Sequence, residues 1–139
     1  MIAERLSEKL GISKGNHICL VDAPQDFAPM FEKHLLGKAR LTDYIGLRGF
    51  DLVMWWPFTI TGLEVKLARL AYSIKPDGAV WLVIPKRQFA DQRGINFSWA
   101  EMQAIALQTD MVDNKTVSIS STDYATRFVI RTQHRYKYL

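Results

Sequence analysis

The chain has 139 residues, of which 48% are hydrophobic, with one cysteine and a formal net charge of +4. A chain of this length can bury roughly two-thirds of its unfolded surface in one domain, and its single cysteine, Cys19, excludes an internal disulfide and a cysteine-rich zinc cluster. Early charges such as Glu4 and Arg5 argue against a signal peptide, and no apolar run reaches the ~20 residues of a membrane span, so we expect a single cytoplasmic domain over residues 1–139.

The first half of the chain alternates amphipathic and apolar segments. Apolar residues four positions apart predict helices, and continuous runs of strand-forming residues predict strands that are covered on both faces. The expected elements are a helix at 2–10, a strand at 17–22, a helix at 27–36, a weak strand at 39–42, a strand at 50–56 and a helix capped by Thr61. The expected inward residues are Phe27, Met30, Phe31 and Leu35 in the second helix, and Val65, Leu67, Ala68, Ala71 and Tyr72 in the third.

The second half continues this alternation. A Pro-Asp-Gly turn at 76–78 is expected to lead into a strand at 79–84. Ser98 and Glu101 have the capping-box spacing of a helix start, and alternating residues predict a hairpin with strands near 112–120 and 126–132. Strands that alternate with helices predict an α/β, Rossmann-like fold in three layers, with a mostly parallel sheet and an antiparallel hairpin at one edge.

The end of the chain carries all of the excess positive charge. Residues 127–139 hold four cations and no acid, so the remaining fourteen cations balance the fourteen acids. A nucleic-acid-binding protein usually has a basic stripe across its folded surface, and here only the basic tail at about 133–139 could stack on and pair with a single strand. We favour a solvated chain end that contributes little to the core, and we do not expect nucleic-acid binding.

Several segments of the chain resemble a known family. They are "EKLGISKG" before the first strand, "APQDF" after it, the strand "FDLV", the segment "KPDGAVWLVIPK" and the helix start at 96–101. Together they resemble a family of small uncharacterised bacterial proteins that carry a trimmed class I S-adenosylmethionine-dependent methyltransferase fold. The resemblance implies that fold, and it implies no particular reaction.

The turn after the first strand departs from the methyltransferase pattern. In that fold the strand ends in an acid and a glycine-rich turn, because glycine allows close backbone approach to the cofactor and positive φ angles. Asp22 matches the acid, whereas Ala23, Pro24, Gln25 and Asp26 replace the glycines. Their side chains would crowd a nucleoside, and Pro24 has no N–H to donate. We therefore expect no cofactor, with S-adenosylmethionine as the alternative.

The connection between the weak strand and the next strand is also short. Only residues 43–49 separate them, whereas a parallel crossover usually needs about a dozen residues and commonly contains a helix. The sequence therefore predicts a fold that is shortened by one strand-helix unit.

Two pairs of residues follow the apolar strands. Trp55 and Trp56 begin "WWPFT", where methyltransferases that act on amino nitrogens carry a polar residue, and Trp56 stands where the acceptor would lie. Adjacent strand residues point to opposite faces, so one Trp is expected in the core and the other at a rim or pocket. Lys86 and Arg87 end the neighbouring strand and could bind a phosphate or carboxylate; with Arg93 they flank a segment that is long enough for a lid, and a solvated loop is the alternative.

No catalytic or metal-binding constellation is found, because the three histidines share no metal-ligand spacing with each other or with the cysteine. We interpret the chain as a non-catalytic or ligand-binding module on a degenerate methyltransferase-like fold, with a small anionic ligand or a protein as partner. The alternative is a minimal S-adenosylmethionine-dependent methyltransferase. The candidate ligand-binding residues are Asp22, Pro24, Gln25, Asp26, Trp55, Trp56, Lys86 and Arg87.

Overall fold

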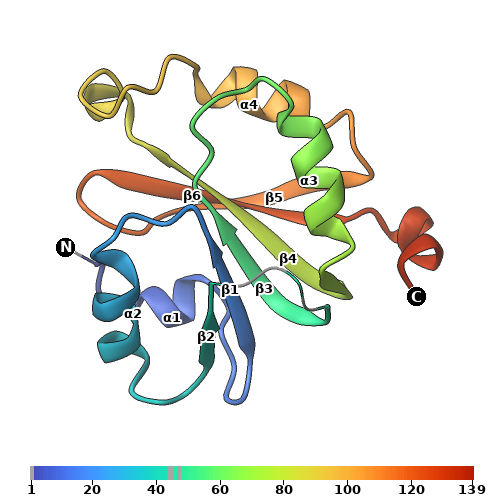
Figure 1. The fold of residues 1–139 in the computed structure, drawn as a ribbon, viewed down its shortest axis with the longest axis horizontal. Helices are drawn as coiled ribbons and strands as arrows, with labels where there is room; N and C mark the ends of the chain where they lie inside the picture. The colour runs from blue at the N-terminus through green and yellow to red at the C-terminus, as the bar shows by residue number, and fades with distance from the viewer. Residues whose placement is uncertain (1, 44–45, 47) are drawn as a thin grey trace.

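The computed structural model describes residues 2–43, 46 and 48–139, and its centre is a six-stranded sheet with helices on both faces (Figure 1). The strands are β1 (His17–Val21), β2 (Arg40–Thr42), β3 (Phe50–Trp55), β4 (Ile74–Pro85), β5 (Met111–Ser118) and β6 (Asp123–Ile130). The helices are α1 (Leu6–Lys9), α2 (Phe27–Leu35), α3 (Leu63–Ala71) and α4 (Trp99–Ala106), with 3₁₀ helices η1 (Arg87–Phe89) and η2 (Thr132–Tyr138).

The strand order is β2-β1-β3-β4-β6-β5. The first four strands in that order are parallel to their neighbours, and β6 pairs antiparallel with both β4 and β5. The predicted parallel strands and the terminal antiparallel hairpin are therefore confirmed, and the weak strand at 39–42 exists as the short edge strand β2. Seven residues, 43–49, connect β2 to β3, and residues 44, 45 and 47 lie outside the described part.

Two hydrophobic clusters cover the two faces of the sheet. On β4, Val80, Leu82 and Ile84 pack with α3 and α4, whereas Trp81 and Val83 pack with α1 and α2. This alternation follows from the two-residue period of a strand and explains why β4 is apolar along most of its length. In Figure 1 the two pairs of helices lie on opposite sides of the sheet, which gives the expected three layers. Within the described residues, no helix is both long and apolar enough to cross a membrane.

The predicted boundaries are wrong at two helix starts. Helix α1 covers only Leu6–Lys9, because the residues before it pair with the hairpin loop, where the Ala3 N–H donates to the Ile119 carbonyl at 2.8 Å. Helix α3 begins after Gly62, which has a φ of 73° and no capping side chain, rather than after a capping Thr61.

The inward faces of the second and third helices also differ in part from the expectation. Met30, Val65 and Tyr72 are 37%, 50% and 48% exposed. In α3 the buried stripe runs instead through Leu63 and Leu70, together with the expected Leu67 and Ala71. The capping box of Ser98 and Glu101 at the start of α4 is confirmed.

The Pro-Asp-Gly segment is not a turn. Residues 76–78 belong to β4, and the pairing with β3 shifts there, since Phe50 pairs with Ile74 but Leu52 pairs with Ala79. The strand therefore absorbs the extra residues as a bulge, which sequence propensity alone does not distinguish from a turn.

The C-terminal segment is anchored by one buried residue, Tyr138, although Tyr136 and Leu139 beside it are exposed. Tyr138 in η2 is 7% exposed, its hydroxyl donates to Asp110 Oδ2 at 2.7 Å, and its ring centroid lies 4.5 Å from that of Tyr72. The expectation that this end contributes little to the core is wrong for Tyr138, because an aromatic ring near the terminus finds an uncovered place beside α3.

Candidate functional site

The carboxyl ends of the central strands form the edge where ligands usually bind in open parallel sheets. The Trp56 N–H donates to the Val21 carbonyl at 3.1 Å, so the segments that follow β1 and β3 leave the sheet side by side. A cleft of about 380 Å³ opens here. It is lined by Asp22, Ala23, Pro24, Trp56, Pro57, Phe58, Val83, Pro85, Arg93 and Ile95.

A second hollow of about 300 Å³ adjoins this cleft and shares Pro24, Trp56 and Arg93 with it. Asp26, Ser120 and Thr122 add polar groups to its wall. Together the two hollows form the carboxyl-edge cleft, whose size is typical of pockets for small molecules.

The turn after β1 takes a left-handed conformation without glycine. Asp22 has a φ of 58°, a region that L residues enter at a cost and that Asp and Asn tolerate better than most residues. The chain thus makes the sharp turn that the methyltransferase pattern assigns to glycine. Ala23 and Pro24 still place side chains on the cleft wall, and the Pro24 carbonyl accepts from the Phe27 N–H at 3.0 Å as α2 begins.

The Asp22 carboxylate is held at the mouth of the cleft. Lys66 Nζ from α3 lies 2.9 Å from Asp22 Oδ2. The same ammonium lies 5.2 Å from the centroid of the Trp55 ring, within reach of a cation–π contact. Both side chains of the ion pair are nearly half exposed, 43% for Lys66 and 47% for Asp22, so Asp22 can exchange this partner for a ligand at little cost.

The two tryptophans point to opposite faces, as predicted. Trp56 packs edge-on against Phe27 with ring centroids 4.8 Å apart, is 5% exposed, and lines the cleft. Trp55 belongs to the cluster under α3 and α4, and its buried indole Nε1 has no hydrogen-bond partner among the described residues. Phe58 is 70% exposed at the rim of the cleft.

An ion pair closes the other wall of the cleft. Arg93 donates through Nη1 and Nη2 to the two carboxylate oxygens of Asp123 at 2.7 and 3.0 Å. The Asp123 side chain is 7% exposed, and it also accepts from the Thr122 hydroxyl at 2.6 Å. The pair thereby joins the segment after β4, which carries Arg93, to the start of β6, which carries Asp123. The sequence offered only the position of Arg93 beside the expected lid, and it gave no signal for Asp123.

The predicted candidates separate into two groups. Asp22, Pro24, Asp26 and Trp56 line the carboxyl-edge cleft. Gln25, Trp55, Lys86 and Arg87 do not, because Trp55 faces the opposite layer and the chain turns into η1 directly after Lys86. Across the described residues, no three His, Cys, Asp or Glu side chains gather as a metal site would require.

The chemistry of the cleft is mixed. Aromatic and aliphatic walls suit a flat apolar group, and the carboxylates of Asp22 and Asp26 accept hydrogen bonds from hydroxyl or amino groups or attract a cation. The hydroxyls of Ser120 and Thr122 supply neutral polar groups in the adjoining hollow.

No family model matches the chain, and no curated protein matches it either. Solved structures with the same fold do. A methyltransferase that depends on S-adenosylmethionine, from Aquifex aeolicus, superposes with a TM-score of 0.60 and 14% identity, covering 91% of this chain and 88% of the other. The N-methyltransferase NodS from Bradyrhizobium japonicum, in complex with S-adenosyl-L-homocysteine, superposes with a TM-score of 0.59 and 9% identity, covering 92% of this chain and 86% of the other.

A chain from the Haloferax volcanii complex of the Trm112 methyltransferase activator with a methyltransferase gives a TM-score of 0.63 at 10% identity, covering 93% of this chain and 88% of the other. These likenesses show a methyltransferase-like α/β fold over about nine-tenths of the chain. They also correct the expectation of no cofactor, since the structures that share the fold include S-adenosylmethionine-dependent methyltransferases and one of them holds S-adenosyl-L-homocysteine.

Proposed function

We propose that this protein is a minimal S-adenosylmethionine-dependent methyltransferase whose cofactor binds in the carboxyl-edge cleft. The observation that supports this most directly is the left-handed turn at Asp22, which opens a cleft at the strand ends although the chain has no glycine there. The general tendency of open parallel sheets to bind ligands beyond the carboxyl ends of their strands supports the same edge.

The residues that line the cleft fit the cofactor in most respects. Asp22 would accept hydrogen bonds from hydroxyl or amino groups, and Trp56, Phe58 and Ile95 would cover its flat apolar part. The unorthodox feature is Pro24, which has no N–H to offer. When bound, S-adenosylmethionine supplies an electrophilic methyl group on its sulfonium. The adjoining hollow, with Asp26 and Thr122, would receive the methyl acceptor.

A second candidate is a binding module that uses the same cleft without methyl transfer. It is favoured by Trp56, whose nearly buried ring lies where an acceptor nitrogen would need a polar partner, and by the absence of a polar residue before Pro57. A protein partner remains part of this proposal, with the exposed Phe58 at the rim as its contact.

Titration with S-adenosylmethionine and with S-adenosyl-L-homocysteine, followed by thermal unfolding and calorimetry, tests the cofactor proposal. At a hundred times the dissociation constant, a ligand adds about 2.7 kcal/mol to stability, and the melting temperature of a domain of this size should rise by about 5 °C or more. The Asp22→Asn variant should lose most of this rise. The exposed Asp91, outside both hollows, gives the matched control Asp91→Asn, which should keep it.

The absence of a saturable rise with either compound would contradict the proposal. Where binding is present, incubation with S-adenosylmethionine and a deproteinised cell extract separates the two candidates. Formation of S-adenosyl-L-homocysteine above the protein-free control supports the methyltransferase, and binding without it supports the module.

A further inference from the structure

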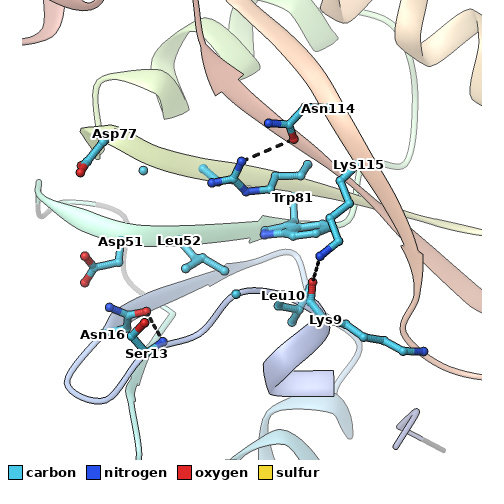
Figure 2. Close-up of a pocket in the computed structure, with 14 residues that line it drawn as sticks. Lys9, Leu10, Ser13, Asn16, Asp51, Leu52, Asp77, Trp81, Asn114 and Lys115 are labelled. Carbon is cyan, nitrogen blue, oxygen red and sulfur yellow. Dashed lines mark hydrogen bonds between the residues drawn. The ribbon is translucent and has the colours of Figure 1, made fainter. Parts of the chain in front are cut away.

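A second large cleft lies at the opposite, amino-terminal edge of the central strands. It has a volume of about 450 Å³ and opens between α1, the loop before β1, and strands β3, β4, β5 and β6 (Figure 2). In Figure 2 the labelled residues fall into two groups, with Asp51 and Asp77 on one side and Lys9 and Lys115 on the other, around the indole of Trp81. The proposed cofactor cleft shares none of its residues.

On the acidic side of this cleft, Asp51 is already paired within the protein. Lys75 Nζ lies 2.8 Å from Asp51 Oδ1, and the other Asp51 oxygen accepts from the His17 N–H at 2.8 Å. The nearby Asp77 adds to the field that raises the Lys75 pKa, after the larger effect of Asp51. Asp51 therefore needs no external cation.

The basic side has no such compensation. Lys9 Nζ donates to the Ser118 carbonyl at 3.3 Å, and Lys115 Nζ donates to the Lys9 carbonyl at 3.0 Å. Arg127 makes one long hydrogen bond, from Nη1 to Asn114 Oδ1 at 3.4 Å. Within residues 2–43, 46 and 48–139, no carboxylate pairs with any of these three cations.

The sheet register places the key donors in one row. Arg127 on β6 pairs directly with Trp81 on β4 and, on its other side, with Lys115 on β5. Directly opposed residues lie on the same face with Cβ atoms about 5 Å apart, and like charges in that position are destabilising. A bulge between Asp113 and Lys115 sets Asn114 beside Arg127. The fold thus places two cations on opposed positions of neighbouring strands, with Arg127 partly buried and Lys115 exposed.

Trp81 adds an independent sign of a missing acceptor. Its side chain is 0% exposed, it forms part of the cleft wall, and its indole Nε1 has no hydrogen-bond partner among the described residues. In Figure 2 the nitrogen edge of the ring is turned toward the middle of the labelled residues. A buried N–H without an acceptor lowers the stability of the fold by about 1–3 kcal/mol, and such groups are rare in native proteins. A bound acceptor would remove this cost.

The electrostatic environment of Arg127 also favours a bound anion. Burial lowers the pKa of its guanidinium from the usual value, and the charge of Arg135 lowers it further. Both effects disfavour the cation, and the negative charge of an oxyanion in the cleft would offset this lowering of the pKa. Among the residues that the structure describes, only one of the five Arg127 donors has a protein partner, and a guanidinium is well suited to bind such an anion through two hydrogen bonds.

We propose that the amino-edge cleft binds a small oxyanion, a phosphate or a carboxylate group of a metabolite, between the Arg127 guanidinium, Lys115 and the indole N–H of Trp81. The cleft leaves room for a ligand body beyond the anionic group, since its volume lies in the range of small-molecule sites. This binding site stands independently of the methyltransferase proposal, because it uses other residues at the other edge of the sheet.

Nuclear magnetic resonance of the full ¹⁵N-labelled chain tests the proposal through the indole N–H signals of the four tryptophans. Inorganic phosphate and citrate are titrated separately at constant ionic strength, and Trp81→Phe assigns the Trp81 signal. A saturable downfield shift of that signal is expected with at least one of the two anions. A response to phosphate alone identifies a phosphorylated ligand, and a response to citrate alone identifies a carboxylate.

Two matched variants give the controls. Arg127→Gln should weaken the binding about tenfold or more, since it removes a charge-assisted bidentate contact, and it should not lower the melting temperature of the anion-free protein, because it also removes like-charge repulsion. Arg87→Gln makes the same change at an exposed position at the other edge and should leave the anion affinity unchanged. The proposal is overturned if the Trp81 signal shows no saturable shift with either anion, or if the two variants bind alike.

Discussion

The ion pair between Arg93 and Asp123 should be worth about 2 kcal/mol to the folded state. Exposed pairs contribute about 0–1 kcal/mol, and loss of one partner of a buried pair costs about 3–5 kcal/mol. This pair lies between these limits, because the Arg93 side chain is 36% exposed whereas that of Asp123 is 7% exposed. In Arg93→Ala, Asp123 would keep the hydrogen bond from the Thr122 hydroxyl, so the loss should be smaller than for a carboxylate without any partner.

Urea unfolding followed by circular dichroism measures this loss as a change in the free energy of unfolding. A double-mutant cycle with Asp123→Asn then isolates the coupling between the two side chains. The control Arg87→Ala removes an exposed arginine that forms no ion pair among the described residues, and it should change stability by no more than about 0.5 kcal/mol. A loss below about 0.5 kcal/mol for Arg93→Ala, or a coupling near zero, would refute the reasoning.

Three further predictions concern the packing of the domain. Tyr138→Phe should lower the free energy of unfolding in urea at neutral pH by about 1 kcal/mol. The Tyr138 hydroxyl is also the main cause of the lowered Asp110 pKa, and a carboxyl with a lowered pKa contributes stability that is present above its ordinary pKa and is lost as the pH falls through the lowered value. This contribution should shrink in the variant, and an unchanged dependence of stability on acid pH would contradict the prediction. Gly78→Ala should destabilise by about 1–3 kcal/mol, since a Cβ would lie 2.9 Å from the Asp51 carbonyl oxygen, and a neutral result would show that the bulge in β4 can shift. Cys19 should resist alkylation at pH 8 until the protein unfolds, because burial raises its pKa to about 11, and rapid modification of the native protein would disprove this.

Strand positions could be predicted because the central strands are buried on both faces. Runs such as "HICLV" and "AVWLVI" have no polar face, and the structure places both in the parallel part of the sheet. The capping box at Ser98 was also recoverable, because its two side chains act within one turn of the helix. Local signals of this kind do not depend on distant residues.

The features that were missed depend on tertiary contacts. In the sequence Tyr138 is part of a basic tail, and only the folded structure brings Tyr72 and Asp110 beside it. The row of Trp81, Arg127 and Lys115 exists only through the register of three strands, and neither spacing nor composition specifies that register. Four of the eight candidate residues line the carboxyl-edge cleft, because the ends of parallel strands meet at one edge of the sheet.

The short connection between β2 and β3 changes which segment encloses the carboxyl-edge cleft. The seven residues at 43–49 are fewer than a parallel crossover with a helix usually needs, and Arg93 and Ile95 from the segment after β4 form part of the cleft wall. Ile95 and Phe97 fix that segment in the core, each 6% exposed, and Arg93 ties it to Asp123. Affinity for S-adenosylmethionine should therefore depend on Arg93 as well as on Asp22. In Arg93→Ala, folded protein at low temperature should show a weaker calorimetric affinity for the cofactor, whereas Arg87→Ala should not. Equal affinities in the two variants would mean that the turn at Asp22 alone holds the ligand.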